Sequence, residues 1–184
     1  MKISTVSLLA LLLLGCQSGQ SGNTSQTPGA NTTQSSSSAD CEAVSHSQLE
    51  ALLPALPAFT RGMPQGETDT AEKVSRTTVD YEDRSGGATI SVELGDTCRN
   101  ENMLISFREA LKSGTPVTGG TTYRSAPVQG FPAYEEWTAE SRHSEIHVLV
   151  SDRFVVKVTG DGLDLAPVQN AAKAIDLQKL AALN

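Results

Sequence analysis

The side chains best suited to chemistry lie in one short stretch, HSEIH at residues 143–147. On a β-strand, side chains alternate between the two faces, so His143, Glu145 and His147 share one face. Two imidazoles and a carboxylate are a plausible metal-ligand set. The same row is also typical of the polar, solvated face of a half-buried strand. The expected pairing with the following strand puts Lys157 opposite His147, where a cation opposes a metal and suits an ion pair with Glu145. We therefore expect a solvated face without a metal or other cofactor, and we keep the metal site as the alternative.

The sequence lacks the other common catalytic patterns. It contains no Gly-x-Ser-x-Gly nucleophile elbow and no glycine-rich phosphate loop before a Lys-Ser or Lys-Thr pair. The turn at residues 160–162 has only Asp164 as a further acidic ligand at a suitable spacing, which favours a simple turn over a calcium loop. Three acidic residues near Trp137 form either an acidic contact patch or a sheet face with one buried tryptophan, and we expect the second: Glu135, Glu136 and Glu140. The sequence predicts no catalytic residue.

The first sixteen residues form a separate unit. Lys2 is followed by a twelve-residue apolar run, residues 3–14. As a helix this run spans about 18 Å, well short of a hydrocarbon core of ~30 Å. It therefore predicts a secretion signal, residues 1–15, rather than a permanent membrane anchor.

The end of this run, Leu13-Leu14-Gly15-Cys16, resembles the lipobox of bacterial lipoproteins. The resemblance covers residues 1–16 only, and no family is identified for residues 41–184. The resemblance implies cleavage before Cys16. Cys16 then carries a diacylglycerol group on its sulfur and an acyl group on its amino nitrogen. More than one acyl chain anchors a protein stably, because each methylene buried in the bilayer adds about 0.8 kcal/mol to the free energy of membrane binding. Gln17 is not the aspartate that favours retention in the inner membrane. The resemblance thus implies an outer-membrane anchor with the domain in the periplasm or at the cell surface, or the outer face of the plasma membrane in a monoderm cell.

Residues 16–40 predict a disordered tether after the lipidated cysteine. They are almost all Ser, Gly, Thr, Gln and Asn, with no charge before Asp40. Such a segment cannot bury enough apolar surface to offset the entropy of ordering. Its root-mean-square span as a flexible coil is about 25–30 Å. It serves either as a leash that lets the domain reach away from the membrane or as a spacer that clears the sorting machinery.

Cys41 and Cys98 remain once the lipidation site is set aside. An even pair in an exported domain predicts a disulfide, which fastens the start of the domain to its body. In the chain-entropy model this bond is worth about 4 kcal/mol. Two unrelated buried thiols are the alternative.

Composition limits the remaining choices. The chain has 184 residues, a formal net charge of −7 and 38% hydrophobic residues. The only apolar run is short, which excludes a polytopic membrane protein. The acidic balance argues against nucleic acid, because phosphate binding needs a basic face. Loss of Lys2 with the signal makes the mature charge −8, almost all of it in residues 41–184.

The hydrophobic pattern over residues 41–184 predicts one α+β domain. Five strands are expected, around 79–81 and 90–94 and over 133–138, 145–150 and 154–159. Tyr81 is expected opposite Ile90 across a loop at 84–87, and Val150 opposite Phe154. The segment 114–132 is expected to be mainly irregular.

Four helices accompany these strands. One begins at a capping box of Ser47 and Glu50, and one covers 104–111 with Gly114 as its stop. A third begins near Asp164, and Asp176 caps a short fourth. The expected architecture is a mostly antiparallel sheet of about five strands with the helices packed on one face.

Three function classes fit these observations. The expected one is a lipid-anchored, non-enzymatic envelope domain that binds an envelope protein, peptidoglycan or a small ligand. It contacts the membrane through the lipid on Cys16 and does not bind nucleic acid. The second is an envelope hydrolase or metalloprotein that uses His143, Glu145 and His147. The third is an inhibitor that neutralises a basic partner protein through its acidic surface.

Overall fold

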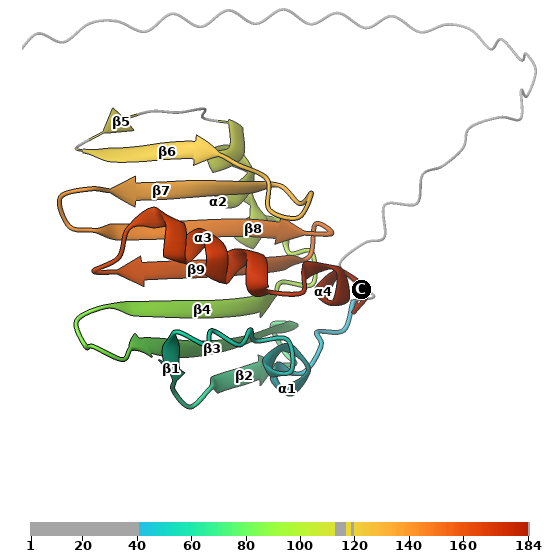
Figure 1. Cartoon of the computed structure of the whole chain (residues 1–184). Coiled ribbons are helices and arrows are strands. Elements are labelled where there is room, and N and C mark those ends of the chain that lie inside the picture. The colour runs from blue at the N-terminus through green and yellow to red at the C-terminus, as the bar shows by residue number, and fades with distance from the viewer. Residues whose placement is uncertain (1–40, 113–116, 119, 184) are drawn as a thin grey trace, which may run out of the picture. The chain divides into compact units, whose positions relative to one another are not determined.

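The computed structural model describes residues 41–112, 117–118 and 120–183 (Figure 1). The expected signal peptide, Cys16, the tether and Gly114 lie outside the described residues. The described chain is an α+β domain with one antiparallel sheet and four helices, as the sequence predicts. None of its helices is long and apolar enough to cross a membrane.

Nine strands form the sheet in the described part of the chain. Their order is β1-β3-β4-β9-β8-β7-β6-β5, and β2 also pairs with β3. β1 and β2 share the outer edge of β3, because β1 pairs with its second half and β2 with its first half. The strands are β1 (Phe59–Arg61), β2 (Gln65–Asp69), β3 (Val74–Asp83), β4 (Thr89–Asp96), β5 (Val117–Thr118), β6 (Thr121–Ser125), β7 (Ala133–Thr138), β8 (His143–Val150) and β9 (Phe154–Asp161).

The expected number of about five strands is wrong, because the pattern detects only the inner part of the sheet. The predicted strands are β3, β4, β7, β8 and β9, whose buried and exposed residues alternate. The additional strands β1, β2, β5 and β6 lie at the two edges. These strands are short, and the residues of β1, β2 and β6 are half-buried or exposed with none buried, so their sequences carry no alternating hydrophobic signal.

The predicted hairpin registers are confirmed. Tyr81 lies opposite Ile90, and the loop between β3 and β4 is closed by a hydrogen bond from the Asp83 backbone N–H to the carbonyl of Ala88. Val150 lies opposite Phe154, across the loop at 151–153. That loop places Ser151 and Asp152 at φ of 54° and 51°, the left-handed conformation that matches the twist of a tight hairpin.

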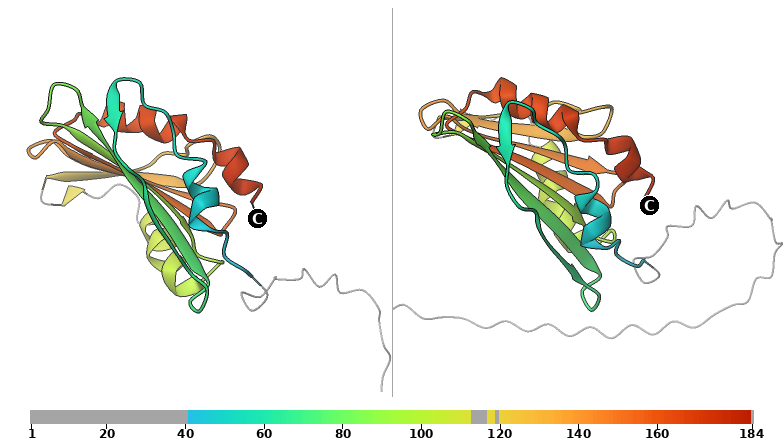
Figure 2. Two further views of the ribbon diagram at one scale, coloured as in Figure 1. Left: turned by 90° about the horizontal axis from the view of Figure 1, so that it is seen from below. Right: turned by 60° about the horizontal axis from the view of Figure 1, so that its bottom comes forward.

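The main core lies on the inner face of the sheet. Fully buried side chains such as Tyr81, Phe154 and Val156 form this face. Three helices cover it: α1 (His46–Glu50), α3 (Leu165–Ala174) and α4 (Leu177–Ala181) (Figure 2). A side chain at Gly160 would collide with Val168, so glycine in β9 lets α3 lie close to the sheet.

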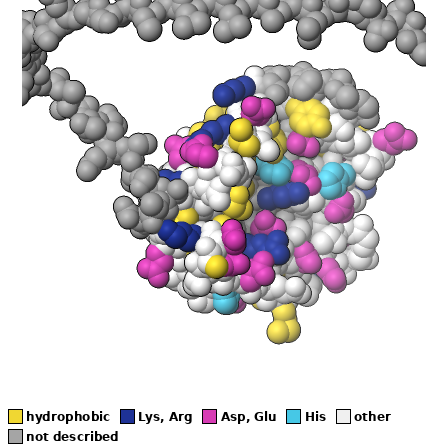
Figure 3. All heavy atoms as spheres, turned by 180° about the vertical axis from the view of Figure 1, so that it is seen from behind, with side chains coloured by type: hydrophobic (Ala, Val, Ile, Leu, Met, Phe, Trp, Pro, Cys, Tyr) yellow, Lys and Arg dark blue, Asp and Glu magenta, His cyan; other side chains and the backbone are white. Residues whose placement is uncertain are grey.

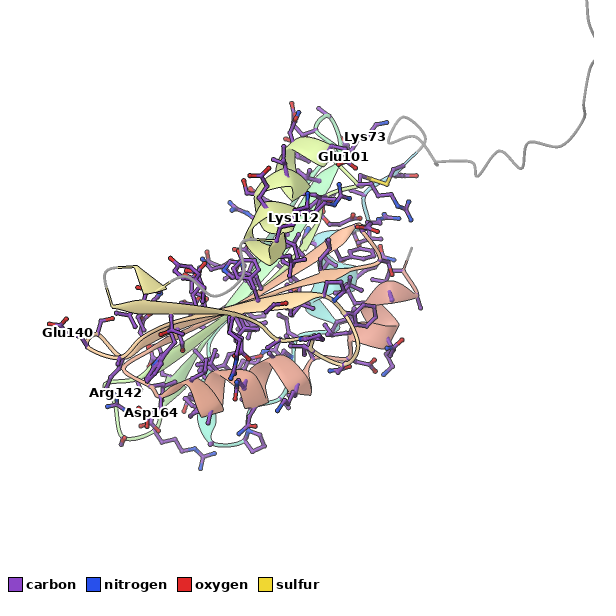
Figure 4. The ribbon with its side chains drawn as sticks, turned by 90° about the horizontal axis from the view of Figure 1, so that it is seen from above. Lys73, Glu101, Lys112, Glu140, Arg142 and Asp164 are labelled. Atoms are coloured by element: carbon purple, nitrogen blue, oxygen red, sulfur yellow. A yellow bond between two sulfur atoms is a disulfide. The ribbon has the colours of Figure 1, made fainter. Side chains whose placement is uncertain are left out.

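The fourth helix, α2 (Glu101–Lys112), packs on the opposite face. Its buried Leu104 and Phe107 contact Leu149, and Tyr134 and Val155 pack beside them. Figure 4 shows α2, from Glu101 to Lys112, across the sheet from α3. The expectation that all helices share one face is therefore corrected. The reason is that Leu149 and Val155, which pair across β8 and β9, interrupt the polar outer row with an apolar contact surface.

The predicted cap of the C-terminal helix α4 is present, but the predicted capping box of α1 is not. Asp176 accepts a hydrogen bond from the Lys179 backbone N–H and caps α4, as predicted. The capping box of α1 consists of Ser45 and Gln48, not Ser47 and Glu50. A bond from the His46 backbone N–H to the Thr68 hydroxyl fixes the first turn there.

Candidate functional site

Part of the outer face of the sheet is not covered by α2, and we call it the open face. Its side chains are polar and come from four neighbouring inner strands and β7. Figure 3 shows acidic, basic and histidine side chains gathered on this side. Strand registers assign to the open face Thr78, Asp80, Ser91, Glu93, Glu136, His143, Glu145, His147, Lys157, Thr159 and Asp161.

Glu145 is the centre of a charged network on this face. His147 Nε2 lies 2.8 Å from Glu145 Oε2, and the Lys157 ammonium lies 2.9 Å from Glu145 Oε1. His143 Nε2 is 3.4 Å from the same Oε1. The structure therefore brings together the three residues that the sequence places on one face. It also confirms the predicted ion pair between Lys157 and Glu145.

Both histidines have further partners that hold their rings. His143 Nδ1 lies 2.7 Å from a carboxylate oxygen of Asp161. The His147 ring stacks on Tyr134, with the ring centres 4.5 Å apart and an angle of 9° between the planes. Tyr134 in turn packs against Phe107 of α2 at 5.2 Å. The network is thus connected to α2 through two aromatic contacts.

The network changes the acidity of its members. The hydrogen bond from His147, with help from Lys157, lowers the pKa of Glu145 to about 2, against the opposing effect of burial. The hydrogen bond to Asp161 raises the pKa of His143 above its ordinary value. Burial raises the pKa of Tyr134 to about 12. Glu145 is accordingly ionised at neutral pH and acts as a fixed acceptor.

The histidines, Glu145 and Lys157 contact one another and do not surround a common site that a metal ion could occupy. Within the described ranges, no cluster of three or more His, Cys, Asp or Glu side chains is arranged to hold a metal ion. Lys157 and the two histidines occupy the carboxylate oxygens that a metal would need. The geometry suits a scaffold of fixed charges.

A cleft of ≈ 580 Å³ lies beside the network, where α2 faces β3 and β4. Glu93 connects the two features, because it lines the cleft and lies opposite Lys157 in the sheet. Gly95, Val155 and Met103 are among the other lining residues. No sequence pattern marks this cleft, because it is formed by segments that are distant along the chain.

The predicted disulfide between Cys41 and Cys98 is present. It joins the first described residue to the segment between β4 and α2. A sequence separation of 57 means that the bond closes a long loop, the case in which the entropic gain is large.

A buried ion pair next to the disulfide was not predicted. Arg153 donates to Asp96 through Nε at 2.9 Å and through its terminal nitrogen at 2.7 Å. Asp96 also accepts the backbone N–H groups of Val44 and Cys98, both at 2.9 Å. Arg153 donates to the carbonyl of Glu42 at 2.8 Å. In sequence both charged residues resemble ordinary turn residues, so no signal marks the pair.

The acidic residues near Trp137 do not form one patch. Glu135 is on the inner side and nearly buried, where Arg124 and Gln169 bind its carboxylate. Glu136 is on the open face, and Glu140 is exposed in the following turn. Trp137 is half-buried rather than buried as expected, and its indole N–H has no partner in the described residues. The separation follows from the alternation of side chains along β7.

Comparison of the chain with family models, curated proteins and solved structures gives no match. The functional argument therefore rests on the residues and the geometry described above.

Proposed function

We propose that the chain is a lipid-anchored protein of the bacterial cell envelope whose domain binds a partner on the open face without catalysing a reaction. The observation that carries this proposal is the contrast between the two faces. Three helices cover the inner face, whereas much of the outer face remains an uncovered surface of ordered charges. An antiparallel sheet commonly packs one face on the core and leaves the other solvated. Here the solvated face carries side chains that neighbouring charges hold in a fixed arrangement, which suits recognition of a partner.

Two observations support the envelope location. The lipobox-like Leu13-Leu14-Gly15-Cys16 implies lipid on Cys16. The disulfide between Cys41 and Cys98 is typical of proteins exported to an oxidising compartment. The proposed location is a lipid anchor in the outer membrane with the domain in the periplasm or at the cell surface. In a monoderm cell it is the outer face of the plasma membrane.

The state of Glu145 supports binding over catalysis. A general acid or base needs a pKa near the working pH and a free path to the substrate. Glu145 has a pKa of about 2, and both of its oxygens are engaged by neighbouring cations or histidines. Such a group holds its neighbours in place and presents a defined charge pattern.

The charge of the open face defines the kind of partner. Carboxylates outnumber cations there, and the only lysine, Lys157, is paired with Glu145 among the described residues. Opposite charges guide association and set specificity. A basic envelope protein therefore fits this face best. The domain either binds that protein as a partner or inhibits it.

Site-specific photo-crosslinking in intact envelopes tests the proposal. A photoreactive amino acid replaces Glu136 on the open face of the full, lipidated chain. The matched control replaces Gln178, an exposed residue of α4 on the other side of the sheet. We expect a discrete adduct with a basic protein from position 136 and none from position 178. Adducts from position 178 alone, or from neither position, would contradict the proposal.

A further inference from the structure

The cleft beside the network has an unusual floor. Gly95 lies inside β4, a central strand, and it lines the cleft. Glycine in a strand interior weakens the strand and often marks a place where another group approaches closely. A β-carbon at Gly95 would meet only two carbonyl oxygens, those of Val155 at 3.7 Å and Ser75 at 3.8 Å. The packing of the domain itself therefore does not require glycine at this position.

Two other glycines within strands, Gly66 in β2 and Gly160 in β9, are required by the packing of the domain. A β-carbon at Gly66 would collide with the His46 side chain, and one at Gly160 would collide with Val168. At both positions another part of the domain fills the space above the glycine. Above Gly95 the space belongs to the cleft, so its floor is left open to a group from outside the described chain.

The walls of the cleft are apolar on one side, and on the other they carry carboxylates together with Arg76, which lies opposite Gly95 and pairs with Glu67. Val155, Val74 and Met103 supply apolar surface, and Met103 of α2 is 50% exposed. The charged side contains Glu93, and among the described residues Glu93 makes no ion pair or side-chain hydrogen bond. Its neighbour across the sheet, Lys157, is bound to Glu145 instead.

The other charged groups of the cleft are already engaged. Glu67 pairs with Arg76 at 2.8 Å, and the buried Asp96 is bound by Arg153. Asp69 accepts the backbone N–H groups of Ala71 and Glu72, which closes the turn between β2 and β3. Glu93 is thus the carboxylate available to a ligand, and it lies next to an apolar floor.

We infer that this cleft binds a lysine side chain of the partner, with the alkyl stem over Gly95 and Val155 and the ammonium at Glu93. A primary ammonium on an apolar stem matches a site that combines one available carboxylate with apolar walls, because long cationic side chains bury their stems while the charge stays near water. This inference rests on the proposed function and specifies the group of the basic partner that is recognised.

A peptide titration followed by NMR tests the inference. The protein is the mature chain with Cys16→Ser, and the probe is a blocked tetralysine peptide, with blocked tetranorleucine as the uncharged control. We expect saturable amide shifts at Gly95, Val155 and Met103 with tetralysine only. Added salt should weaken the binding, because Coulomb attraction is screened.

Two substitutions separate the cleft from the rest of the open face. Gly95→Val fills the floor and should reduce the affinity for tetralysine at least tenfold without lowering Tm, because valine is favoured in strands. Glu93→Gln should reduce it by a similar factor. Ser91→Val adds bulk to the same face of the same strand but outside the cleft, and it should reduce the affinity far less than Gly95→Val does.

The possible failures are distinguishable. No binding of tetralysine, or unchanged affinity in Gly95→Val, would overturn the inference. Shifts confined to the surroundings of Glu136 and His143 would also overturn it, while leaving the open face as a binding surface for a basic partner. Crosslinking from position 136 tests the proposed function independently, since it does not depend on the peptide.

Discussion

At the scale of single residues, the central feature is the set of charges around Glu145. The row of His143, Glu145 and His147 and its pairing with Lys157 are predictable, because alternation and hairpin register involve neighbouring strands. The stacking of Tyr134 on His147 is not predictable, since it depends on how β7 is placed beside β8. Local patterns thus identify the members of the network but not what surrounds them.

Glu145 should make stability depend on pH in the acidic range. Its pKa falls from 4.5 to about 2 on folding, so the ionised form stabilises the native state above pH 4.5. This contribution, up to about 3 kcal/mol, should be lost as the pH falls from 4.5 towards 2. Urea unfolding of the wild type should show that the free energy of unfolding decreases across this pH range. For Glu145→Gln the decrease should be much smaller. Parallel curves for the two proteins would contradict the prediction.

The buried pair of Asp96 and Arg153 should be sensitive to the loss of one partner. Asp96→Asn leaves the guanidinium of Arg153 buried without its counter-ion and should cost about 3–5 kcal/mol in the free energy of unfolding. Adding Arg153→Met removes that charge and should recover part of the loss. Denaturant titration of both variants checks this order. A double variant less stable than the single one would show that the pair acts in another way.

At the scale of elements, the position of α2 distinguishes the two faces of the sheet. The helix itself is predictable from the spacing of Leu104, Phe107 and Leu111. The face on which it packs is not, because that depends on Leu149 and Val155, two apolar residues at outward positions of β8 and β9. The edge strands are not predictable for a related reason: a solvated strand such as β2 has no row of buried residues in its sequence.

Adjacent residues of β8 provide a matched test of the two layers. Leu149 packs against α2, whereas Val148 belongs to the main core. Leu149→Ala should cost about 2–4 kcal/mol and should reduce hydrogen-exchange protection mainly in α2. Val148→Ala should instead reduce protection across the sheet and α3. An equal loss of protection in α2 and α3 on Leu149→Ala would contradict the prediction, because it would show that α2 does not unfold separately from the main core.

At the scale of the whole molecule, the sequence predicts a signal, a lipidated cysteine, a tether and one domain. The structure confirms the α+β domain and the disulfide at its start. The bonds from Arg153 to Glu42 and from Val44 to Asp96 add to that disulfide. The point at which the chain enters the domain is therefore fastened covalently and by hydrogen bonds, as suits a domain held by its N-terminal side.

Cys16 should determine membrane attachment. The wild-type chain, expressed in a bacterium with lipoprotein processing, should sediment with membranes and incorporate an alkyne-labelled fatty acid. Cys16→Ala should do neither, because the thiol that receives the lipid is absent. Cys41→Ala with Cys98→Ala is the control: it should lower stability by up to about 4 kcal/mol without loss of the label. Labelling of Cys16→Ala would contradict the proposed anchor.

The most direct test of the central claim compares crosslinking from the two sides of the sheet. The account predicts an adduct with a basic envelope protein from position 136 and none from position 178, and it predicts a lower yield when Asp80→Lys reverses an exposed charge of the open face outside the cleft. An adduct that forms from position 178 alone, or one whose yield is unchanged by the charge reversal, would contradict recognition through this face.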